Sequence, residues 1–241
     1  AIYPQDYNFS HKTGNHESEN SLSAASLNES NDETGDREDS DKNDGATPPD
    51  EKQTIVKHCL IIPAAFQDVP LKAKKEWMEK LIGGENGIQK YFDDQFLGEY
   101  EFHFHLADPV TLSRKRAYYG KNLNGKDRYE YLAADEACHI AHEKGVDFSQ
   151  FDGDGDGLVD NVFVIVAGED ESDGGGEDCI WSHAGKLSNF NKQFQLDSKT
   201  IDSYAITSEL RKRSNGTFGS ATIGVFCHEY SHTLGLKDMY D

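Results

Sequence analysis

Residues 225–241 read "VFCHEYSHTLGLKDMYD" and contain the pattern His-Glu-x-x-His-x-x-Gly-x-x-Asp. On a helix, His228 and His232 lie four residues apart and therefore point the same way. Two imidazoles in that arrangement can bind one zinc ion, each at about 2.0–2.1 Å. Gly235 allows a left-handed residue at which the helix ends and the chain folds back. Asp238 follows three residues later, where a third ligand is needed.

The residue types in this motif favour a catalytic site over a structural one. Three protein ligands leave the fourth position of a zinc ion open, which is the mark of catalytic zinc. We therefore expect His228, His232 and Asp238 to bind zinc, and Glu229 to act as general base on a water molecule at the metal. The competing interpretation is an acidic surface helix with two exposed histidines, which leaves Gly235 and Asp238 unexplained.

A second metal-binding pattern, "FDGDGDGLVD", occupies residues 151–160. Carboxylates at alternate positions can converge on Ca²⁺, and the glycine that follows them lets the chain turn. The expected calcium ligands are the side chains of Asp152, Asp154, Asp156 and Asp160, with the backbone carbonyl of Leu158. An EF-hand would need Glu where Phe163 stands, so we expect a shorter, structural calcium loop. A flexible acidic turn is the alternative.

Apolar periodicity predicts that strands and helices interleave along the chain. We expect buried strands at residues 54–66 and 161–169, an alternating strand at 99–112, and a shorter edge strand at 198–210. Helices are expected at residues 71–84, 86–98, 126–145 and 221–235. This order of elements predicts an α/β (α+β) fold with a mixed, twisted β-sheet.

Other reactive side chains receive non-catalytic interpretations. His103 and His105 alternate with aromatic residues and are interpreted as the wetter face of a strand rather than as metal ligands. The four cysteines have no Cys-x-x-Cys spacing, so we expect small buried thiols, with one disulfide as the alternative. The acidic run "GEDESDGGGED" at residues 168–178 is interpreted as a mobile surface loop, and a second calcium site there is not favoured.

Charge and composition divide the chain and exclude some classes of partner. The formal net charge of −20 argues against nucleic acids and anionic membrane surfaces as partners. Residues 1–52 hold thirteen acidic and four basic side chains, and we expect a disordered acidic linker or propeptide remnant. Residues 53–241 hold the expected strands and helices together with both metal-binding patterns. No run reaches the roughly 18 apolar residues of a membrane span.

The zinc motif followed by "MYD" resembles the immune inhibitor A family of secreted bacterial metallopeptidases, which are metzincin-like zincins. The segments "FHLADPVTL", "AYYG", "IWSHAG" and "SYAITSEL" follow that family's order, so the resemblance covers about residues 55–241. It implies that residues 53–241 are the N-terminal part of a metallopeptidase catalytic domain of zincin type, with a zinc-binding active-site helix. It also implies a zinc-dependent endopeptidase that binds calcium, is made as a zymogen, and is secreted or held in the bacterial cell envelope. No export signal is present in this chain.

The resemblance sets further expectations about substrates and completeness. Protein or peptide substrates are expected to add as an extra strand at a sheet edge, for which residues 200–210 are the candidate, and His183 could border the cleft. We expect a monomer. Met239 is too close to Asp238 to form the Met turn of metzincins, so we expect a truncated C-terminal subdomain, weak zinc binding and poor turnover in this piece. The alternative function is an inactive, calcium-stabilised binding module with a protease-like fold, against which the retained Glu229 argues.

Overall fold

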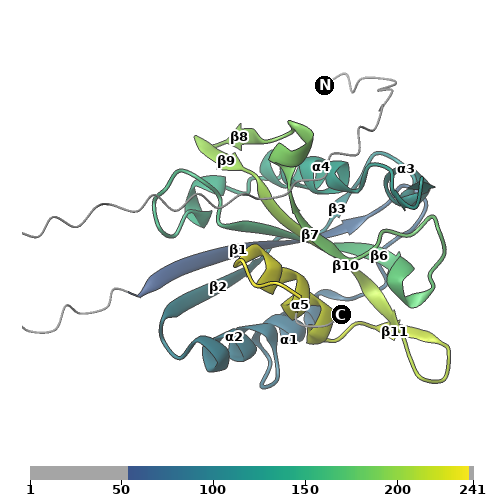
Figure 1. Ribbon diagram of the computed structural model, residues 1–241, viewed down its shortest axis with the longest axis horizontal. Coiled ribbons are helices and arrows are strands. Elements are labelled where there is room, and N and C mark those ends of the chain that lie inside the picture. The colour runs from purple at the N-terminus through teal and green to yellow at the C-terminus, as the bar shows by residue number, and fades with distance from the viewer. Residues whose placement is uncertain (1–53, 239–241) are drawn as a thin grey trace, which may run out of the picture. The chain divides into compact units, whose positions relative to one another are not determined.

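The computed structural model describes residues 54–238, and its centre is a seven-stranded mixed β-sheet (Figure 1). Five strands follow the order β11-β10-β6-β1-β2, while β3 pairs with β1 and β7 pairs with β10. The sheet consists of β1 (Ile55–Ala65), β2 (Tyr100–Leu106), β3 (Val110–Thr111), β6 (Asn161–Glu169), β7 (His183–Lys186), β10 (Ser203–Lys212) and β11 (Phe218–Ser220). Two small hairpins are β4 (Asn122–Leu123) with β5 (Lys126–Asp127), and β8 (Phe194–Leu196) with β9 (Lys199–Ile201).

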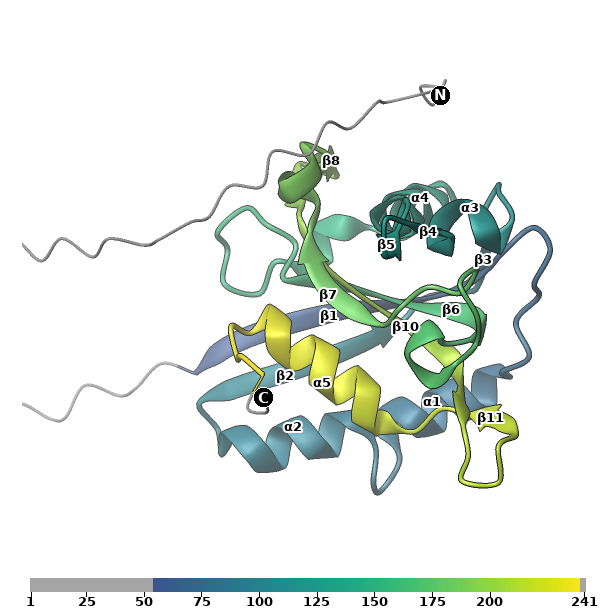
Figure 2. The ribbon, with the colours of Figure 1, turned by 45° about the vertical axis from the view of Figure 1, so that its right-hand side comes forward.

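Helices cover both faces of this sheet (Figure 2). The helices are α1 (Lys75–Gly83), α2 (Ile88–Phe96), α3 (Arg116–Gly120), α4 (Glu130–Glu143) and α5 (Ile223–Thr233), with 3₁₀ turns η1 (Phe148–Phe151), η2 (Glu171–Asp173) and η3 (Leu187–Phe190). Apolar residues of α1, α2 and α5 share one core with one face of the sheet. Residues of α3 and α4 share a second core with the other face. The predicted mixed α/β class is confirmed.

The central strands are buried on both sides, as their continuous apolar runs predicted. β6 is buried at every residue from Asn161 to Gly168 and lies parallel to both β1 and β10. Parallel strands covered by helices on both faces have this composition because neither face meets water. β2 instead alternates: Phe102 is buried in the core with α2, whereas Glu101 and His105 on the other face are exposed.

The prediction of an edge strand at residues 198–210 is wrong. β10 pairs in parallel with β6 on one side, and its other side is covered antiparallel by β7 and then by β11. The four residues of β7, "HAGK", are too few and too polar to produce a recognisable strand pattern. Within residues 54–238, the outer side of β7 carries no paired strand, so β7 rather than β10 is an edge next to α5.

Two other sequence interpretations have different outcomes. All four cysteines are free and buried, as expected of small apolar residues: Cys59, Cys138, Cys179 and Cys227. The interpretation of residues 168–178 as a surface loop is confirmed in part: residues 171–178 are exposed or half-buried, but Asp170 at the start of the run has no exposed surface. Arg211 on β10 holds that carboxylate at 2.9 Å from its Nη1 atom. The expected linker at residues 1–52 lies outside the described residues, and none of the described helices has the length and apolarity to cross a bilayer.

Glu209 on β10 connects three segments through its buried carboxylate. Oε1 accepts hydrogen bonds from the backbone N–H groups of Lys72 at 2.9 Å and Gly168 at 3.1 Å. Oε2 accepts from Lys72 at 2.9 Å and from Ala73 at 2.6 Å. The side chain therefore joins the segment that follows β1 to the C-terminal end of β6.

Substitution Glu209→Ala is expected to lower the free energy of unfolding by about 3 kcal/mol, because it leaves the buried N–H of Gly168 and the part-buried N–H groups of Lys72 and Ala73 without acceptors. Urea denaturation followed by circular dichroism measures this loss. The exposed Glu85→Ala is the matched control and should stay within about 0.5 kcal/mol of the unsubstituted chain. Equal effects of the two substitutions would show that Glu209 does not anchor these segments.

Candidate metal centre

Helix α5 presents its two histidines outward because the residue two positions before each of them is anchored in the core. Phe226 and Tyr230 are each 1% exposed. The Phe226 ring stacks on Phe163 of β6 with centroids 3.8 Å apart, and Tyr230 packs edge-on against Phe92 of α2. Since His228 and His232 follow these anchors by two residues, they fall on the opposite side of the helix.

The predicted ligand atoms lie close together. His228 Nε2 and His232 Nε2 are 3.2 Å apart, and Asp238 Oδ1 lies 3.4 Å from the first and 3.3 Å from the second. Two nitrogens bound tetrahedrally to one zinc ion at about 2.0–2.1 Å lie about 3.3 Å apart. The three side chains therefore fit a zinc ion. Glu229 Oε1 is 4.0 Å from His228 Nε2, so the carboxylate borders the same space.

The turn after α5 explains how Asp238 reaches the histidines. Gly235 has φ +90°, a left-handed conformation that the missing Cβ makes accessible. Leu236 donates its N–H to the carbonyl of Ser231 at 3.1 Å, which folds the chain back along the helix. The carbonyl of Leu236 lies 2.8 Å from His232 Nδ1. That nitrogen must donate there, so Nε2 keeps a lone pair for a metal ion.

Glu229 has the environment of a general base near neutral pH. Glu229 is 6% exposed, and this burial raises the pKa of its carboxyl group to about 7. The negative charges of Asp170 and Asp238 raise the pKa further. A carboxylate with a pKa near the working pH is well matched to accepting and returning a proton.

Behind Glu229 lies a buried polar network that the sequence did not reveal. Asp170 accepts hydrogen bonds from Ser182 Oγ and from the backbone N–H of Ser172, and it pairs with Arg211. Arg211 Nε also lies 2.8 Å from Asp173. The network ties the loop after β6 to β10. No spacing rule could have found it, since Arg211 lies about 40 residues from Asp170 and Asp173 and belongs to a different element.

His183 is held by two hydrogen bonds that leave neither ring nitrogen for catalysis. Nδ1 lies 2.8 Å from the carbonyl of Trp181, to which it must donate. Nε2 then accepts from the hydroxyl of Tyr204 at 3.2 Å. Burial lowers the pKa of His183, so the ring is neutral in this setting. The residue orients the start of β7 beside α5.

The Asp-Gly loop brings three of its predicted calcium ligands together. Ligand oxygens of Asp152, Asp154 and Asp156 all lie within 4.8 Å of one another. The Asp152 side chain has no exposed surface, and its Oδ1 atom is buried without a hydrogen-bond partner among the described residues. A buried carboxylate oxygen without a donor is costly unless a cation is bound. The donor set therefore fits Ca²⁺.

Two lysines partly neutralise this loop. Lys57 Nζ lies 2.5 Å from Asp154 Oδ2, and Lys199 Nζ lies 2.6 Å from Asp152 Oδ2. The Lys57 ammonium lowers the pKa of Asp154. For Asp152, burial opposes ionisation, but the bonds from Lys199 and from the backbone N–H of Gly157 keep its pKa lowered. Both carboxylates are therefore charged and available to a cation.

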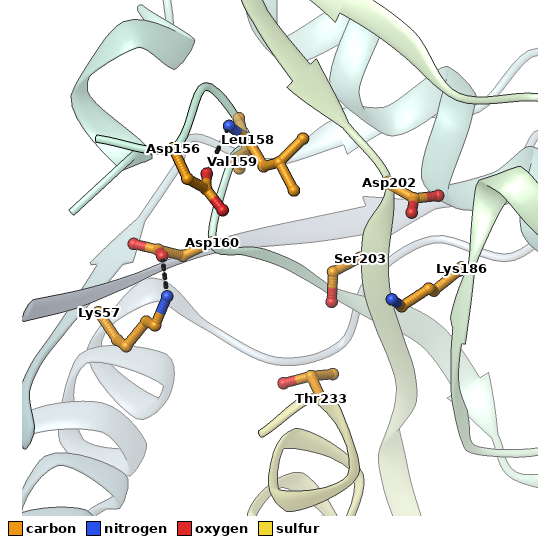
Figure 3. Close-up of a pocket in the computed structure, with 9 residues that line it drawn as sticks. All are labelled: Lys57, Asp156, Leu158, Val159, Asp160, Lys186, Asp202, Ser203 and Thr233. Atoms are coloured by element: carbon orange, nitrogen blue, oxygen red, sulfur yellow. Dashed lines mark hydrogen bonds and ion pairs between the residues drawn. The ribbon is translucent and has the colours of Figure 1, made fainter. Parts of the chain in front are cut away.

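Asp160 and Leu158 lie beside this group rather than within it. Asp160 Oδ2 accepts from the backbone N–H groups of His58 and Gly153, each at 2.9 Å, and Oδ1 lies 2.7 Å from Lys57. Leu158 donates its N–H to Asp156 Oδ1 at 2.8 Å. Their roles as calcium ligands stay predictions. Figure 3 shows both residues at a small cavity that also borders Thr233 at the end of α5.

Comparison with known proteins places the chain in a family. The model of the immune inhibitor A peptidase M6 catalytic domain matches residues 64–241. The chain belongs to this family. It is 29% identical to "Immune inhibitor A" of Bacillus thuringiensis subsp. alesti over 210 aligned residues, covering 69% of this chain and 29% of that protein.

A second relative is similarly distant. The chain is 29% identical over 188 residues to "Pre-pro-metalloprotease PrtV" of Vibrio cholerae strains M66-2 and N16961, covering 66% of this chain and 19% of that protein. The chain thus spans less than a third of the length of these relatives. The resemblance to immune inhibitor A noted in the sequence is confirmed, and the family is one of metal-dependent proteases.

In this M6 domain, Asp238→Ala is expected to weaken zinc binding more than about tenfold, because even an outer partner of a zinc ligand contributes that much. Competition with a chromogenic zinc chelator measures the affinity. Asp178→Ala removes an exposed carboxylate elsewhere and should leave the affinity unchanged. If Asp238→Ala binds zinc as tightly as the control, Asp238 is not a ligand.

Calcium is expected to raise the melting temperature of the M6 domain by about 5–10 °C at a hundredfold excess over its dissociation constant. Chelation with EGTA should reverse the shift. Asp154→Asn should abolish most of it, because the substitution removes a converging charge from an exposed position. Asp178→Asn serves as the control in differential scanning fluorimetry. A shift that survives Asp154→Asn at full size would place calcium elsewhere.

Proposed function

We propose that this chain carries the catalytic centre of a zinc-dependent endopeptidase that hydrolyses peptide bonds in proteins. The observation that supports this most directly is the convergence of His228, His232 and Asp238 within 3.4 Å beside the buried Glu229. Membership of the peptidase M6 family supports the class of reaction, and one relative is named a metalloprotease.

A bound zinc ion would polarise the peptide carbonyl and make a water molecule acidic enough to attack near neutral pH. The residues of the chain supply the remaining steps. Glu229 takes a proton from the attacking water and later returns it to the leaving amine. The Asp170–Arg211 pair fixes the loop after β6, and the negative charge of Asp170 helps to raise the pKa of Glu229. Asp238 brings a negative charge to the ligand set, which strengthens cation binding.

The substrate is proposed to lie along β7. This short strand borders α5, and among the described residues its outer side has no partner strand. An extended peptide can therefore donate and accept main-chain hydrogen bonds there, which is a general mode of peptide recognition. This proposed substrate-binding edge on β7 replaces residues 200–210, which were the candidate edge in the sequence analysis.

Calcium binding, export and activation complete the proposal. Calcium bound in the loop at residues 152–160 would fix the start of β6. Asp160 at the end of this loop already accepts a hydrogen bond from the backbone N–H of His58 on β1. Synthesis with removable leader segments is supported by the printed name of PrtV, which describes a pre-pro-protein. Secretion to the medium or cell envelope follows from such processing. A monomeric state and the role of residues 1–52 stay predictions.

Substitution Glu229→Gln in the protein that carries this chain is expected to reduce kcat/KM for casein cleavage by about 10²–10⁴-fold, the usual contribution of a general base. Zinc content should stay at one equivalent, since glutamine has nearly the same shape. Glu85→Gln, at an exposed position, should cleave at the normal rate. A zinc chelator should abolish activity and added zinc should restore it.

Cleavage by Glu229→Gln at the rate of the unsubstituted protein would refute the assignment of the base. Absence of cleavage by the unsubstituted, zinc-loaded protein would favour the alternative, an inactive binding module stabilised by calcium.

A further inference from the structure

A tryptophan side chain is exposed at the beginning of the proposed substrate-binding edge. Trp181 is 54% exposed, although its neighbours Ile180 and Ser182 are only 1% and 5% exposed. It lies two residues before β7 and belongs to neither of the two apolar cores formed by the described residues. A large apolar side chain that is held in solvent between two buried residues gains free energy when a partner covers it.

The backbone of Trp181 is fixed, so the exposed ring projects from a rigid position. Its N–H donates to Asp127 Oδ2, at the end of β5, over 2.9 Å. Its carbonyl accepts from His183 Nδ1 over 2.8 Å. Because the backbone is already ordered by these bonds, a partner that covers the ring costs little further conformational entropy.

Trp181 lies at the end of β7 that is close to the candidate zinc centre. Ser182, the next residue, donates a hydrogen bond from its Oγ atom to Asp170. Asp170 belongs to the buried polar network behind Glu229. β7 itself contacts α5 and lies beside it in Figure 2. A peptide bound along β7 therefore passes α5 and reaches Trp181.

The middle of β7 offers a peptide little besides its main chain. The ring of His183 turns inward and bonds to the hydroxyl of Tyr204. At Gly185, a Cβ atom would lie 2.9 Å from that hydroxyl, so Tyr204 already fills the space of a side chain. Ala184 packs against the core that contains α5. Main-chain hydrogen bonds do not depend on the sequence of the peptide, so its selection depends on side-chain contacts at the ends of this strand.

The two ends of this edge differ in chemistry. Lys186, at the far end, carries a positive charge beside the small cavity that Figure 3 shows. Trp181, at the end near Glu229, is apolar. An extended chain rises about 3.3 Å per residue, so a bound peptide of about six residues can contact both ends.

We propose that the ring of Trp181 forms a subsite that selects a large apolar side chain, aromatic or leucine, of the peptide bound along β7. This inference rests on the proposed function, because it names a preference of the same substrate site. Tryptophan is enriched among the residues that dominate binding energy, since it offers a large and rigid apolar surface. The bound substrate and the transition state both make this contact, so it lowers KM and leaves kcat unchanged. Trp181 is therefore a specificity-determining residue.

The test uses the protein that carries this chain and a set of fluorogenic peptides built on one alanine-rich host. A single leucine or phenylalanine is moved through each position on both sides of the cleaved bond. The unsubstituted protein is expected to prefer the apolar residue at one position by at least about tenfold in KM. Trp181→Ala should remove that preference, while kcat and cleavage of the host peptide stay within about twofold. Trp181→Phe, which keeps an aromatic ring, should retain most of the preference.

Leu97→Ala is the matched control, because Leu97 is an apolar residue that is 86% exposed at the end of α2. This variant should keep the full preference. The proposal would be overturned by the absence of a preference in the unsubstituted protein, or by an unchanged preference in Trp181→Ala. An equal loss for the host peptide and the apolar peptides would also overturn it, because that result indicates a structural role.

A binding measurement separates this proposal from the proposed function. The same peptides are titrated with zinc-loaded Glu229→Gln, with and without Trp181→Ala, and binding is followed by fluorescence anisotropy. A preference that depends on Trp181 supports the subsite even if the unsubstituted protein cleaves no peptide, and only the proteolytic function is then refuted. Cleavage without such a preference refutes the subsite alone.

Discussion

Burial of the aromatic side of α5 against the central sheet is the constraint on which the candidate zinc centre depends. Phe226 stacks on Phe163 and Tyr230 packs against Phe92. These contacts fix which side of the helix faces the sheet. Removing one such buried aromatic side chain typically costs about 3–5 kcal/mol, so other rotations are not populated. The orientation of the two histidines is therefore set by residues outside the candidate zinc site.

The parallel strands bring the rest of the site to this helix. β6 carries the Asp-Gly loop at its beginning and Asp170 just after its end, so one buried strand fixes both a candidate calcium loop and the polar network behind Glu229. Glu209 joins the C-terminal end of β6 to the segment after β1 through hydrogen bonds. A rigid sheet thus places groups that are distant in sequence within hydrogen-bond distance.

Electrostatics accounts for the features that packing leaves unexplained. The chain is strongly acidic, and several of its carboxylates are paired: Asp152 with Lys199, Asp154 with Lys57, and Asp170 with Arg211. The pairing at the Asp-Gly loop is incomplete, since Asp152 Oδ1 is buried without a partner among the described residues. Calcium would supply the missing charge.

The sequence by itself determined the features that depend on local spacing. The four-residue interval between His228 and His232, the left-handed Gly235 and the alternate aspartates each follow from helix, turn or loop geometry within about a dozen residues. The apolar runs of β1 and β6 likewise predicted buried strands. Only the tertiary structure decided that β7 rather than β10 forms the edge, that Asp170 is buried against Arg211, and that His58 meets His103 and His105. These contacts join residues from about 20 to nearly 50 positions apart, and strand order, which creates them, leaves no periodic trace in the sequence.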